Sequence, residues 1–398
     1  MLGVLFLTSH LPFPPNSGGR LREYQIIKNL AGRCNIFVCA VTKTYDFDLK
    51  ESTGLQEYCT EIRLFKAYQD VDKIADQKLP DQMIRNHSDE AKDYIDYLLS
   101  NGLVQLIHCE GYYMVQNIPL NCKVPVVLAE QNVEYSILEQ KLSVADTEED
   151  KSFYSKEAEN IAHFERDVWD HVDLRIALTQ DDYSEITKQA GSENTLLISD
   201  GIDHLKNYSG DNIPKENCDL ESRKYILYVG NFEYSPNADA AKYLIDEIYP
   251  QIREKFPDVE LFVVGNKGEI QLQEYISRPG VVITGWADDL RCYYQNAQMC
   301  LYPLRMGGGI KVKILEALTN NKVVVTTPIG AQGIPVVEKS GLHVGNDVKD
   351  IVEISCNMLG QILENPNMRD VDNTANLNGF YSWKETCDQL YEAYEKLV

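Results

Sequence analysis

The chain has 398 residues, of which 44% are hydrophobic, and it carries 38 Lys and Arg against 61 Asp and Glu, a formal net charge of -23. Nucleic acid and anionic lipid repel so negative a chain, which argues against nucleic-acid binding and against a strong membrane patch. No apolar run reaches the roughly 18 residues of a membrane span. The ten scattered cysteines lack metal-ligand spacing, which indicates reduced thiols and a cytoplasmic protein.

Short apolar runs alternate with segments of helical periodicity along the chain. Continuous apolar runs of about four to six residues are typical of strands that are covered on both faces. Their alternation with helices predicts right-handed βαβ units and parallel sheets. The predicted strands are Val4–Leu7, Ile36–Val41, Val104–His108, Val124–Leu128 and Leu174–Leu178, then Tyr225–Val229, Leu261–Val264, Val281–Thr284, Met299–Tyr302 and Val323–Thr326.

A polar segment at 203–223, with Gly, Pro and Asn, separates the two series of strands as a linker does. At roughly 100–200 residues per domain, we predict two Rossmann-like α/β domains, 1–203 and 204–379. The last helix follows both series and could pack on either domain. The predicted helices are Arg20–Leu30, Asp150–Trp169, Ala240–Phe256, Val312–Leu318 and Trp383–Leu397.

The loop Pro12–Arg20, PFPPNSGGR, follows the first predicted strand and leads into a helix. Gly18 and Gly19 let the backbone approach a ligand closely, and the N–H groups that open a helix favour anions. Open α/β sheets bind ligands at the carboxyl ends of their strands. We therefore predict ligand contacts for Gly18 and Gly19, with a simple strand-to-helix turn as the alternative.

The segment Tyr302–Ala317, YPLRMGGGIKVKILEA, places consecutive glycines between a predicted strand and a predicted helix. The N–H groups of such a loop can cradle an anion, and Arg305 and Lys311 can neutralise a phosphate. The carboxylate of Glu316 can accept hydrogen bonds from two ribose hydroxyls. A turn alone would need fewer glycines. The predicted ligand-binding residues here are Gly307, Gly308, Gly309, Ile310, Lys311 and Glu316.

Other predicted strands also end in residues suited to a ligand. Gly230 and Asn231 follow one strand in VGNFEYSPN, although helix capping accounts for part of this segment. Gly265 follows the next strand, and Trp286 follows a third, where an aromatic ring can stack on a nucleotide base. We predict that Gly230, Asn231, Gly265 and Trp286 bind the same ligand.

Two carboxylates in the first half are candidates for acid–base chemistry or for binding a hydroxyl. Glu110 in IHCEG and Glu130 in EQNVE both follow buried strands. His108 is more simply explained as a core group. Asp46 and Asp48 form a DFD triplet in a polar loop without supporting ligands, and no Cys/His cluster suggests zinc, so we predict no metal site.

These segments resemble the group 1 (family 4) glycosyltransferases of the GT-B fold over nearly the whole length of the chain. The resemblance is strongest from YILYVGNFEYSPN through VVITGWADDL to YPLRMGGGIKVKILEALTNNKVVVTTPIGAQGI, and it includes PFPPNSGGRLREYQ, EQNVEY, LLISDGID and FYSW. It implies two Rossmann-like domains facing each other across a cleft, retention of anomeric configuration and no metal. It also implies that the last helix crosses back, so that 380–398 joins 1–203.

The chain departs from the family pattern at two places. The family signature is Glu-x7-Glu, in which Glu316 matches the second glutamate and Gly308 stands at the first, the usual contact of the transferred sugar. The chain here resembles a subset with a PLR-x-G-x-G-x-K loop. Asn231 stands where the family has an arginine, so the pyrophosphate charge would fall to Arg305, Lys311 and Lys313.

The resemblance implies an enzyme that transfers a sugar from a nucleoside diphosphate donor to an acceptor hydroxyl in glycan or surface polysaccharide synthesis. Arg305 and Lys311 would stabilise the leaving pyrophosphate, and the acceptor, a glycan, lipid-linked or protein molecule, would enter near Glu110 and Glu130. We expect no cofactor and a cytoplasmic location, with weak peripheral association at the inner membrane face as a variant. A nucleotide-sugar epimerase of the same fold and a non-catalytic donor-binding subunit are the alternatives.

Overall fold

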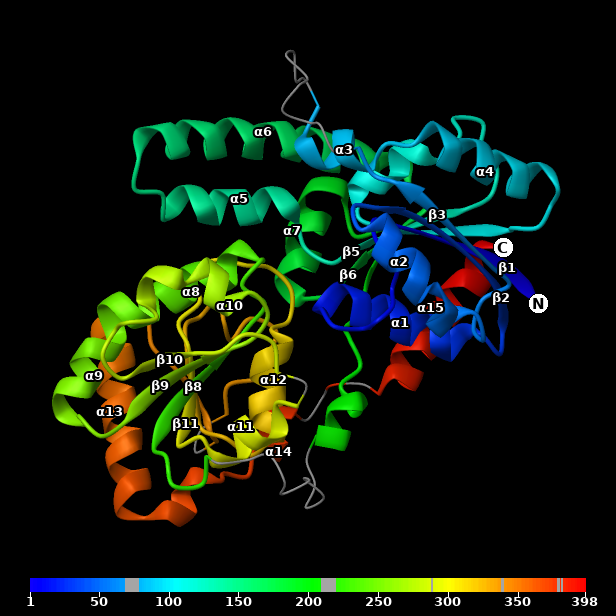
Figure 1. Cartoon of the computed structure of the whole chain (residues 1–398). Coiled ribbons are helices and arrows are strands. Elements are labelled where there is room, and N and C mark those ends of the chain that lie inside the picture. Colours follow the sequence, from blue (N-terminus) through cyan, green and yellow to red (C-terminus); the bar gives the residue numbers. More distant parts are fainter. Residues whose placement is uncertain (69–78, 209–219, 288, 338–339, 378–379, 381) are drawn as a thin grey trace. The chain divides into compact units, whose positions relative to one another are not determined.

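The computed structural model describes residues 1–68, 79–208, 220–287, 289–337, 340–377, 380 and 382–398 (Figure 1). The chain divides into two compact units, Met1–Gly201 with Tyr381–Val398, and Ile202–Phe380. The domain boundaries predicted from the sequence, after residues 203 and 379, lie one or two residues from these divisions.

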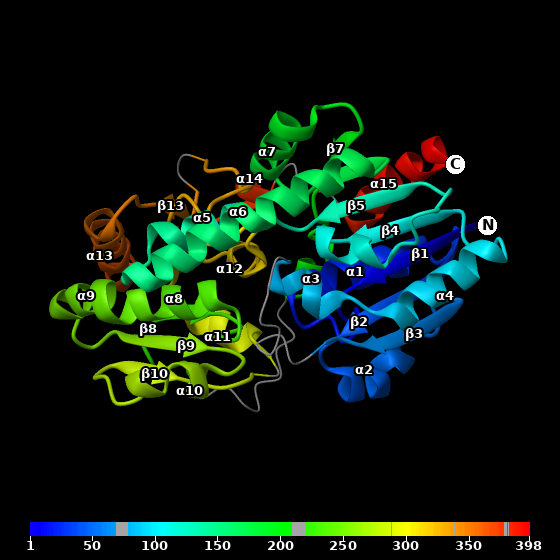
Figure 2. The same cartoon turned by 90° about the horizontal axis from the view of Figure 1, so that it is seen from above.

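The first unit is built on a parallel sheet of seven strands in the order β3-β2-β1-β4-β5-β6-β7 (Figure 2). The order reverses between β1 and β4, where crossover connections leave toward opposite faces. The strands are β1 (Leu2–Thr8), β2 (Cys34–Thr42), β3 (Glu61–Lys66), β4 (Leu106–Glu110), β5 (Val126–Glu130), β6 (Leu174–Ala177) and β7 (Thr195–Leu197).

Helices cover both faces of this sheet, because successive side chains of a strand point to opposite sides. Leu5 and Leu7 of β1 pack in one buried cluster with side chains of α4 (Asp89–Ser100), α6 (Glu148–His171) and α7 (Gln180–Ala190). Val4 and Phe6 pack in another with α1 (Gly18–Leu30) and α15 (Trp383–Leu397). The sheet is thus the middle layer of three.

The last helix, α15, belongs to the first unit although the whole second unit precedes it in the chain (Figure 1). Its buried residues Trp383, Leu390 and Tyr394 lie in the same cluster as α1, and Ser382 and Glu385 form a capping box at its start. The expectation that the last helix crosses back to the first domain is confirmed.

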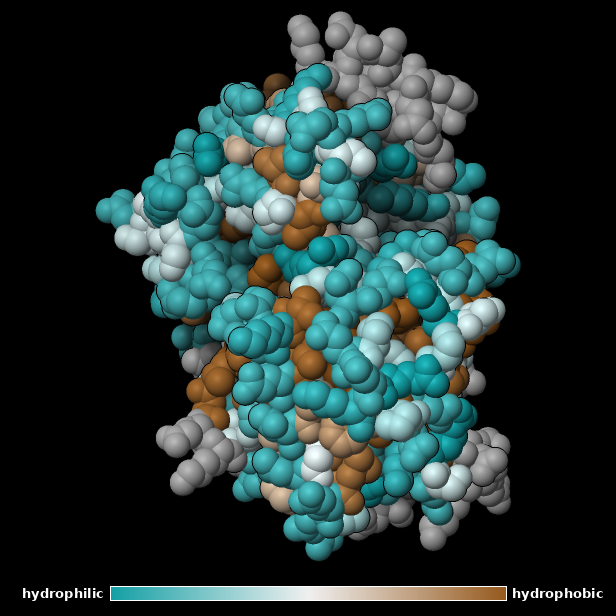
Figure 3. Space-filling model, turned by 90° about the vertical axis from the view of Figure 1, so that its left-hand side faces the viewer, coloured by the Kyte–Doolittle hydropathy of each residue, from teal (hydrophilic) through white to brown (hydrophobic). Residues whose placement is uncertain are grey.

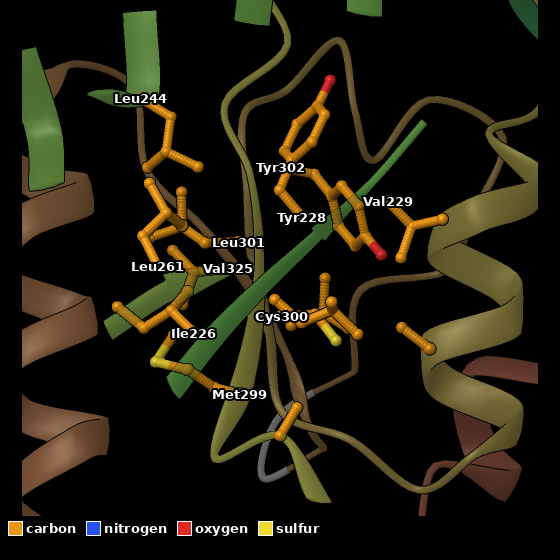
Figure 4. Packing of buried hydrophobic residues seen from close by; sticks show 14 of the residues in the cluster. Ile226, Tyr228, Val229, Leu244, Leu261, Met299, Cys300, Leu301, Tyr302 and Val325 are labelled. Atoms are coloured by element: carbon orange, nitrogen blue, oxygen red, sulfur yellow. The ribbon is translucent and has the colours of Figure 1, made fainter. Parts of the chain in front are cut away.

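The second unit has a parallel sheet of six strands in the order β10-β9-β8-β11-β12-β13, which reverses between β8 and β11. One continuous hydrophobic cluster fills its core, and Figure 4 shows part of it around β8 and β11. The strands are β8 (Tyr225–Val229), β9 (Glu260–Val264), β10 (Val281–Ile283), β11 (Met299–Tyr302), β12 (Val324–Thr326) and β13 (Leu342–Val344).

The predicted helix Ala240–Phe256 is interrupted in the structure. It consists of α8 (Ser235–Tyr243), a π-helical turn (Leu244–Ile248) and α9 (Tyr249–Lys255). Pro250 explains the break, because proline has no N–H to donate and its ring crowds the carbonyl four residues earlier. The other helices are α2 (Tyr45–Glu51), α3 (Asp81–Asn86), α5 (Glu134–Ser143), α10 (Gly268–Gln271), α11 (Arg291–Asn296), α12 (Val312–Thr319), α13 (Val348–Glu364) and α14 (Thr374–Leu377).

Hydrophilic residues predominate on the face shown in Figure 3. Within the described ranges, no helix combines the length and apolar character needed to cross a bilayer. In the part of the chain that the structure describes, eight cysteines are free thiols, six of them buried, as the sequence predicts. Cys292 is disulfide-bonded and is an exception to that prediction.

Candidate functional site

Strand order reverses at one place in each sheet. These places lie at the carboxyl ends of β8 and β11 in the second unit and of β1 and β4 in the first. Ligands of open α/β sheets bind outside such points. Most residues singled out in the sequence lie in the loops that leave these strands.

The glycine loop of the second unit connects β11 to α12. Gly307 (φ 124°) and Gly309 (φ 64°) have backbone angles that favour glycine. The Lys311 ammonium turns back on the loop and donates to the carbonyl oxygens of Gly307, Gly308 and Gly309 at 3.2, 3.1 and 2.7 Å. In this state Lys311 holds the loop in shape, and Ile310 packs against the hydrophobic core.

Arg305 precedes the glycine loop and is held by α8. Its Nε and Nη2 donate to the two carboxylate oxygens of Asp239 at 3.0 and 2.5 Å, and its guanidinium lies 4.6 Å from the ring centre of Tyr243. A bidentate, stacked pair of this kind fixes the arginine in one orientation. A phosphate predicted at Arg305 would therefore share the guanidinium with Asp239.

Lys313, one turn before Glu316 on α12, points to the end of β8. Its ammonium is hydrogen-bonded to the Asn237 side-chain oxygen and lies 5.3 and 5.9 Å from the ring centres of Tyr228 and Tyr302, which are neighbours in Figure 4. Burial, and next the repulsion from Lys311, lower the pKa of Lys313 to about 7. A cation so destabilised gains from a nearby anion.

Glu316 shares this environment. Its Oε2 accepts a hydrogen bond from the Tyr294 hydroxyl at 3.1 Å, and its side chain is partly exposed. Burial raises the pKa of Glu316 to about 7, against the opposing effects of Tyr294 and Lys313. Two groups with displaced pKa values at the end of a strand are typical of a functional site.

The glycines at the ends of β8 and β9 serve the fold as well as any ligand. A Cβ on Gly265 (φ 141°) would lie 2.0 Å from the Gly230 carbonyl oxygen, so only glycine fits there. Asn231 is hydrogen-bonded within the unit. Its side-chain oxygen accepts from Asn266 Nδ2 at 3.2 Å, and its backbone carbonyl oxygen accepts from Asn237 Nδ2 at 2.8 Å. Trp286 is 60% exposed and can reach a ligand.

In the first unit, Glu110 ends β4 within a buried hydrogen-bond chain. Its Oε1 lies 2.8 Å from His108 Nε2, its Oε2 accepts from Gln131 at 3.1 Å, and the Tyr394 hydroxyl lies 2.6 Å from His108 Nδ1. Burial would raise the pKa of Glu110, but His108, Arg22 and Gln131 together lower it. Glu110 is therefore an ionised group that organises its neighbours.

Glu130 ends β5 and has the opposite character. Its Oε1 accepts from the Trp169 indole N–H at 2.9 Å, and it is 1% exposed. Burial raises the pKa of Glu130 to about 8, so the carboxyl is largely protonated at neutral pH. Because both carboxyls are buried and bonded within the unit, the structure favours a positioning role for Glu110 and Glu130.

Replacing Glu130 by glutamine is expected to raise the free energy of unfolding more at pH 8 than at pH 5. The folded-state pKa lies above the ordinary value, so wild-type stability falls as pH rises from about 4.5 to 8, by roughly 1.4 kcal/mol per unit for one group. Glutamine does not ionise and can still accept from Trp169. Urea unfolding at both pH values measures the difference, with exposed Glu159→Gln as control; an equal effect at both values would contradict the protonated state.

The paired glycines at the start of α1 differ in their surroundings. A Cβ on Gly18 would meet open space, whereas one on Gly19 would lie 2.6 Å from the side-chain oxygen of Gln131. Gly19 thus makes room for the Gln131 amide that bonds Glu110. Gly18 remains available for a ligand at the helix start.

Sequence reasoning missed a further group at the end of β1. Glu23 on α1 accepts from Thr8 Oγ1 at 2.7 Å and lies 3.0 Å from His10 Nε2. Arg22 beside it is ion-paired with Asp200 of the LLISDGID segment. In the sequence, the only indication of a role for Arg22 and Glu23 is their position on this helix beside its stripe of apolar side chains.

A pocket of about 290 Å³ opens in the first unit beside these residues. It is lined from β1 to α3 by hydroxyl, amide and basic side chains. Its hydroxyl and amide groups come from Ser9, Thr42, Thr44, Gln82, Asn86 and Tyr113.

Among the described residues, no three His, Cys, Asp or Glu side chains form a group that could hold a metal ion. Asp48 of the DFD triplet is fully buried and accepts from both Nη1 and Nη2 of Arg20 at 3.1 Å. Asp46 is exposed. The triplet therefore contributes a structural ion pair.

Comparison with known proteins matches the second unit to a family. Residues 223–361 match the family described as "Glycosyl transferases group 1", a segment that contains the glycine loop, Lys313 and Glu316. An uncharacterized 44.6 kDa protein in the cps region of Klebsiella pneumoniae is 21% identical over 383 residues, which cover 90% of this chain and 92% of that protein.

Solved structures with the same architecture extend the comparison to both units. Sucrose-phosphate synthase from Thermosynechococcus elongatus has a TM-score of 0.70 at 16% identity and covers 100% of this chain and 99% of its own. Anabaena Alr3699/HepE in complex with UDP-glucose has a TM-score of 0.68 at 16% identity over 100% of both chains. At such identities the likeness shows the shared fold. The chain thus carries a glycosyltransferase group 1 domain on a GT-B fold, which makes it an enzyme of the glycosyltransferase class.

Proposed function

We propose that the chain transfers a sugar from a nucleoside diphosphate sugar to an acceptor hydroxyl, with retention of configuration and without a metal. The observation that carries the proposal is the cluster of Lys313, Glu316 and the Gly307–Gly309 loop where the second sheet reverses its strand order. The Anabaena complex with UDP-glucose supports a sugar nucleotide as donor and makes uridine the first base to test.

The donor would lie across the carboxyl ends of β8 and β11. Glu316, which keeps one oxygen beyond its bond to Tyr294, would accept ribose hydroxyls. Trp286 would stack on the base. The glycine loop and the N-terminus of α12 would meet the diphosphate, because backbone N–H groups and the helix dipole favour an anion.

Catalysis would consist mainly in stabilising the leaving diphosphate. Lys313 is suited to this task because its destabilised charge becomes more favourable when an anion arrives. Arg305 would add a second cation in exchange for part of its pairing with Asp239, and Lys311 would keep the loop in place. Glu110 and Glu130 would position the acceptor's surroundings in the first unit, and Gly18 and Gly19 would line its approach. With no protein nucleophile assigned, the donor phosphate would act as base on the attacked face.

The relative from a cps region supports a role in surface polysaccharide synthesis, and the PLR-x-G-x-G-x-K loop supports membership of the subset with that glycine-rich loop. We propose a cytoplasmic enzyme that acts on a glycan, lipid-linked or protein acceptor. Its contact with the inner membrane face would be peripheral.

Replacing Glu316 by alanine is expected to weaken nucleotide binding about 10- to 100-fold, because hydrogen bonds to a charged group contribute about 1.5–3 kcal/mol. Calorimetric titration with UDP, GDP, ADP and TDP in EDTA measures it and names the base. Glu353→Ala, an exposed change on α13, is the control.

Three outcomes would count against the proposal. Absence of binding to every nucleotide would remove the donor site. An epimerase would be favoured if the nucleotide sugar bound and NMR showed interconversion of the donor sugar without transfer to any acceptor. A donor-binding subunit would be favoured if the nucleotide sugar bound without any turnover.

A further inference from the structure

The pocket of the first unit has an unusual charge for this chain. The chain carries 61 acidic against 38 basic residues, yet none of the nine described residues that line the pocket has a carboxylate. Arg20 and Lys43 in its wall are basic side chains that carry positive charge. A cavity of one sign in a protein of the other sign concentrates ligands of the protein's own charge.

The acidic groups behind the wall are already engaged. Asp48 accepts two hydrogen bonds from Arg20 and one from Thr44 Oγ1 at 3.0 Å, and it is fully buried. Glu23 faces His10 and Thr8. These carboxylates orient the basic side chains without projecting into the space.

Lys43 is the exposed cation of the pocket, on the turn that follows β2. Loss of water around its ammonium, and next the nearby Arg85 guanidinium, lower the pKa of Lys43. A lysine whose charged form is disfavoured in this way is stabilised when an anion binds beside it.

Asn86 supplies a second, independent indication of a ligand. Its side chain is 3% exposed and lines the pocket, and its Nδ2 donates to the Gln82 carbonyl at 2.7 Å. Its Oδ1 has no hydrogen-bond partner in the part of the chain that the structure describes. Buried amide oxygens are nearly always paired, so a hydroxyl from a ligand would complete this group.

We propose that this pocket binds the acceptor through a sugar that bears an acidic group, with a hydroxyl on Asn86 and the carboxylate or phosphate at Lys43. The inference rests on the proposed transfer reaction and assigns the class of its acceptor. A volume of about 290 Å³ suits one sugar ring with its acidic substituent. The surrounding hydroxyls of Ser9, Thr44 and Tyr113 suit the remaining ring hydroxyls.

The test compares glucuronic acid, glucose 6-phosphate, glucose and inorganic phosphate as ligands in calorimetric titrations of the full chain. We expect both acidic sugars to bind at least tenfold more tightly than glucose. Lys43→Gln should remove that advantage and Asn86→Ala should weaken every sugar, whereas Lys50→Gln, an exposed lysine of α2 outside the pocket, should change nothing.

The proposal would be overturned if glucose bound as tightly as the acidic sugars. It would also be overturned if the Lys43→Gln variant bound the acidic sugars as tightly as wild type. Inorganic phosphate binding as tightly as glucose 6-phosphate would overturn its sugar part. UDP titrated into the same samples separates the two proposals: UDP binding without acidic-sugar binding sinks only the pocket assignment, and acidic-sugar binding without nucleotide binding sinks the donor site.

Discussion

Replacing Lys313 by methionine is expected to lower the rate of sugar transfer about 100- to 1000-fold, which is the usual effect of removing one group that stabilises charge developing in the transition state. The ammonium of Lys313 lies at the end of β8, on Asn237 and above two tyrosine rings. Methionine has a similar length and fills the same space without the charge. The measurement is nucleotide release from the sugar nucleotide that wild type turns over.

The same substitution should leave the fold intact. Because burial already disfavours the charged form of Lys313, its loss is expected to keep or raise the melting temperature. Lys313→Arg is the matched control, since it retains the charge and should keep part of the activity. A Lys313→Met enzyme with the wild-type rate would show that Arg305 and the glycine loop suffice to stabilise the leaving diphosphate.

Nucleotide affinity should also depend on pH through this lysine. With a pKa of about 7 in the free site, Lys313 loses its proton as pH rises, so wild-type affinity is expected to fall between pH 7 and 9. Glu316, whose pKa is also about 7, ionises over the same range and opposes the trend for the ribose. The comparison of wild type with Lys313→Met isolates the lysine, because only wild type should show the fall.

The fold could be predicted from the sequence wherever strands are fully buried. All ten predicted strands are present, and the three that were missed, β3, β7 and β13, lie at sheet edges. The β3 strand carries Glu61, Arg63 and Lys66 and is half exposed, so it lacks the continuous apolar run that marks the central strands. Charged edge strands protect a sheet from further pairing, and this hides them from a hydrophobicity pattern.

The backbone segments that form the candidate site could be predicted from the sequence, but the side-chain contacts between them could not. The glycine loop and Glu316 stand out because glycine runs and strand ends are visible along the chain, and their part in a ligand site stays a prediction. The partner of Arg305 is Asp239, 66 residues away, and that of Lys313 is Asn237, 76 residues away. Such pairings are set by strand order, which the sequence pattern leaves open, and the pocket beside Asn86 was missed for the same reason.

Replacing Gly265 by alanine is expected to destabilise the second unit by about 2–6 kcal/mol. A Cβ at this position would lie 2.0 Å from the Gly230 carbonyl oxygen, and the backbone has φ 141°, which side chains disfavour. Strained backbone costs roughly 1–3 kcal/mol and overpacking a similar amount. Gly265 would then be needed for the close approach of the loops after β8 and β9 before any ligand binds.

Gly360→Ala provides the contrast, because both changes add one methyl group to the same unit. Gly360 lies within α13, where the nearest atom to a Cβ is a Phe256 ring carbon at 3.9 Å, and alanine there should stabilise by about 0.5–1 kcal/mol. Urea unfolding of both variants gives the difference. If Gly265→Ala unfolds like wild type yet loses nucleotide affinity, the glycine contacts the donor directly; if stability falls first, its role is to hold the site's framework.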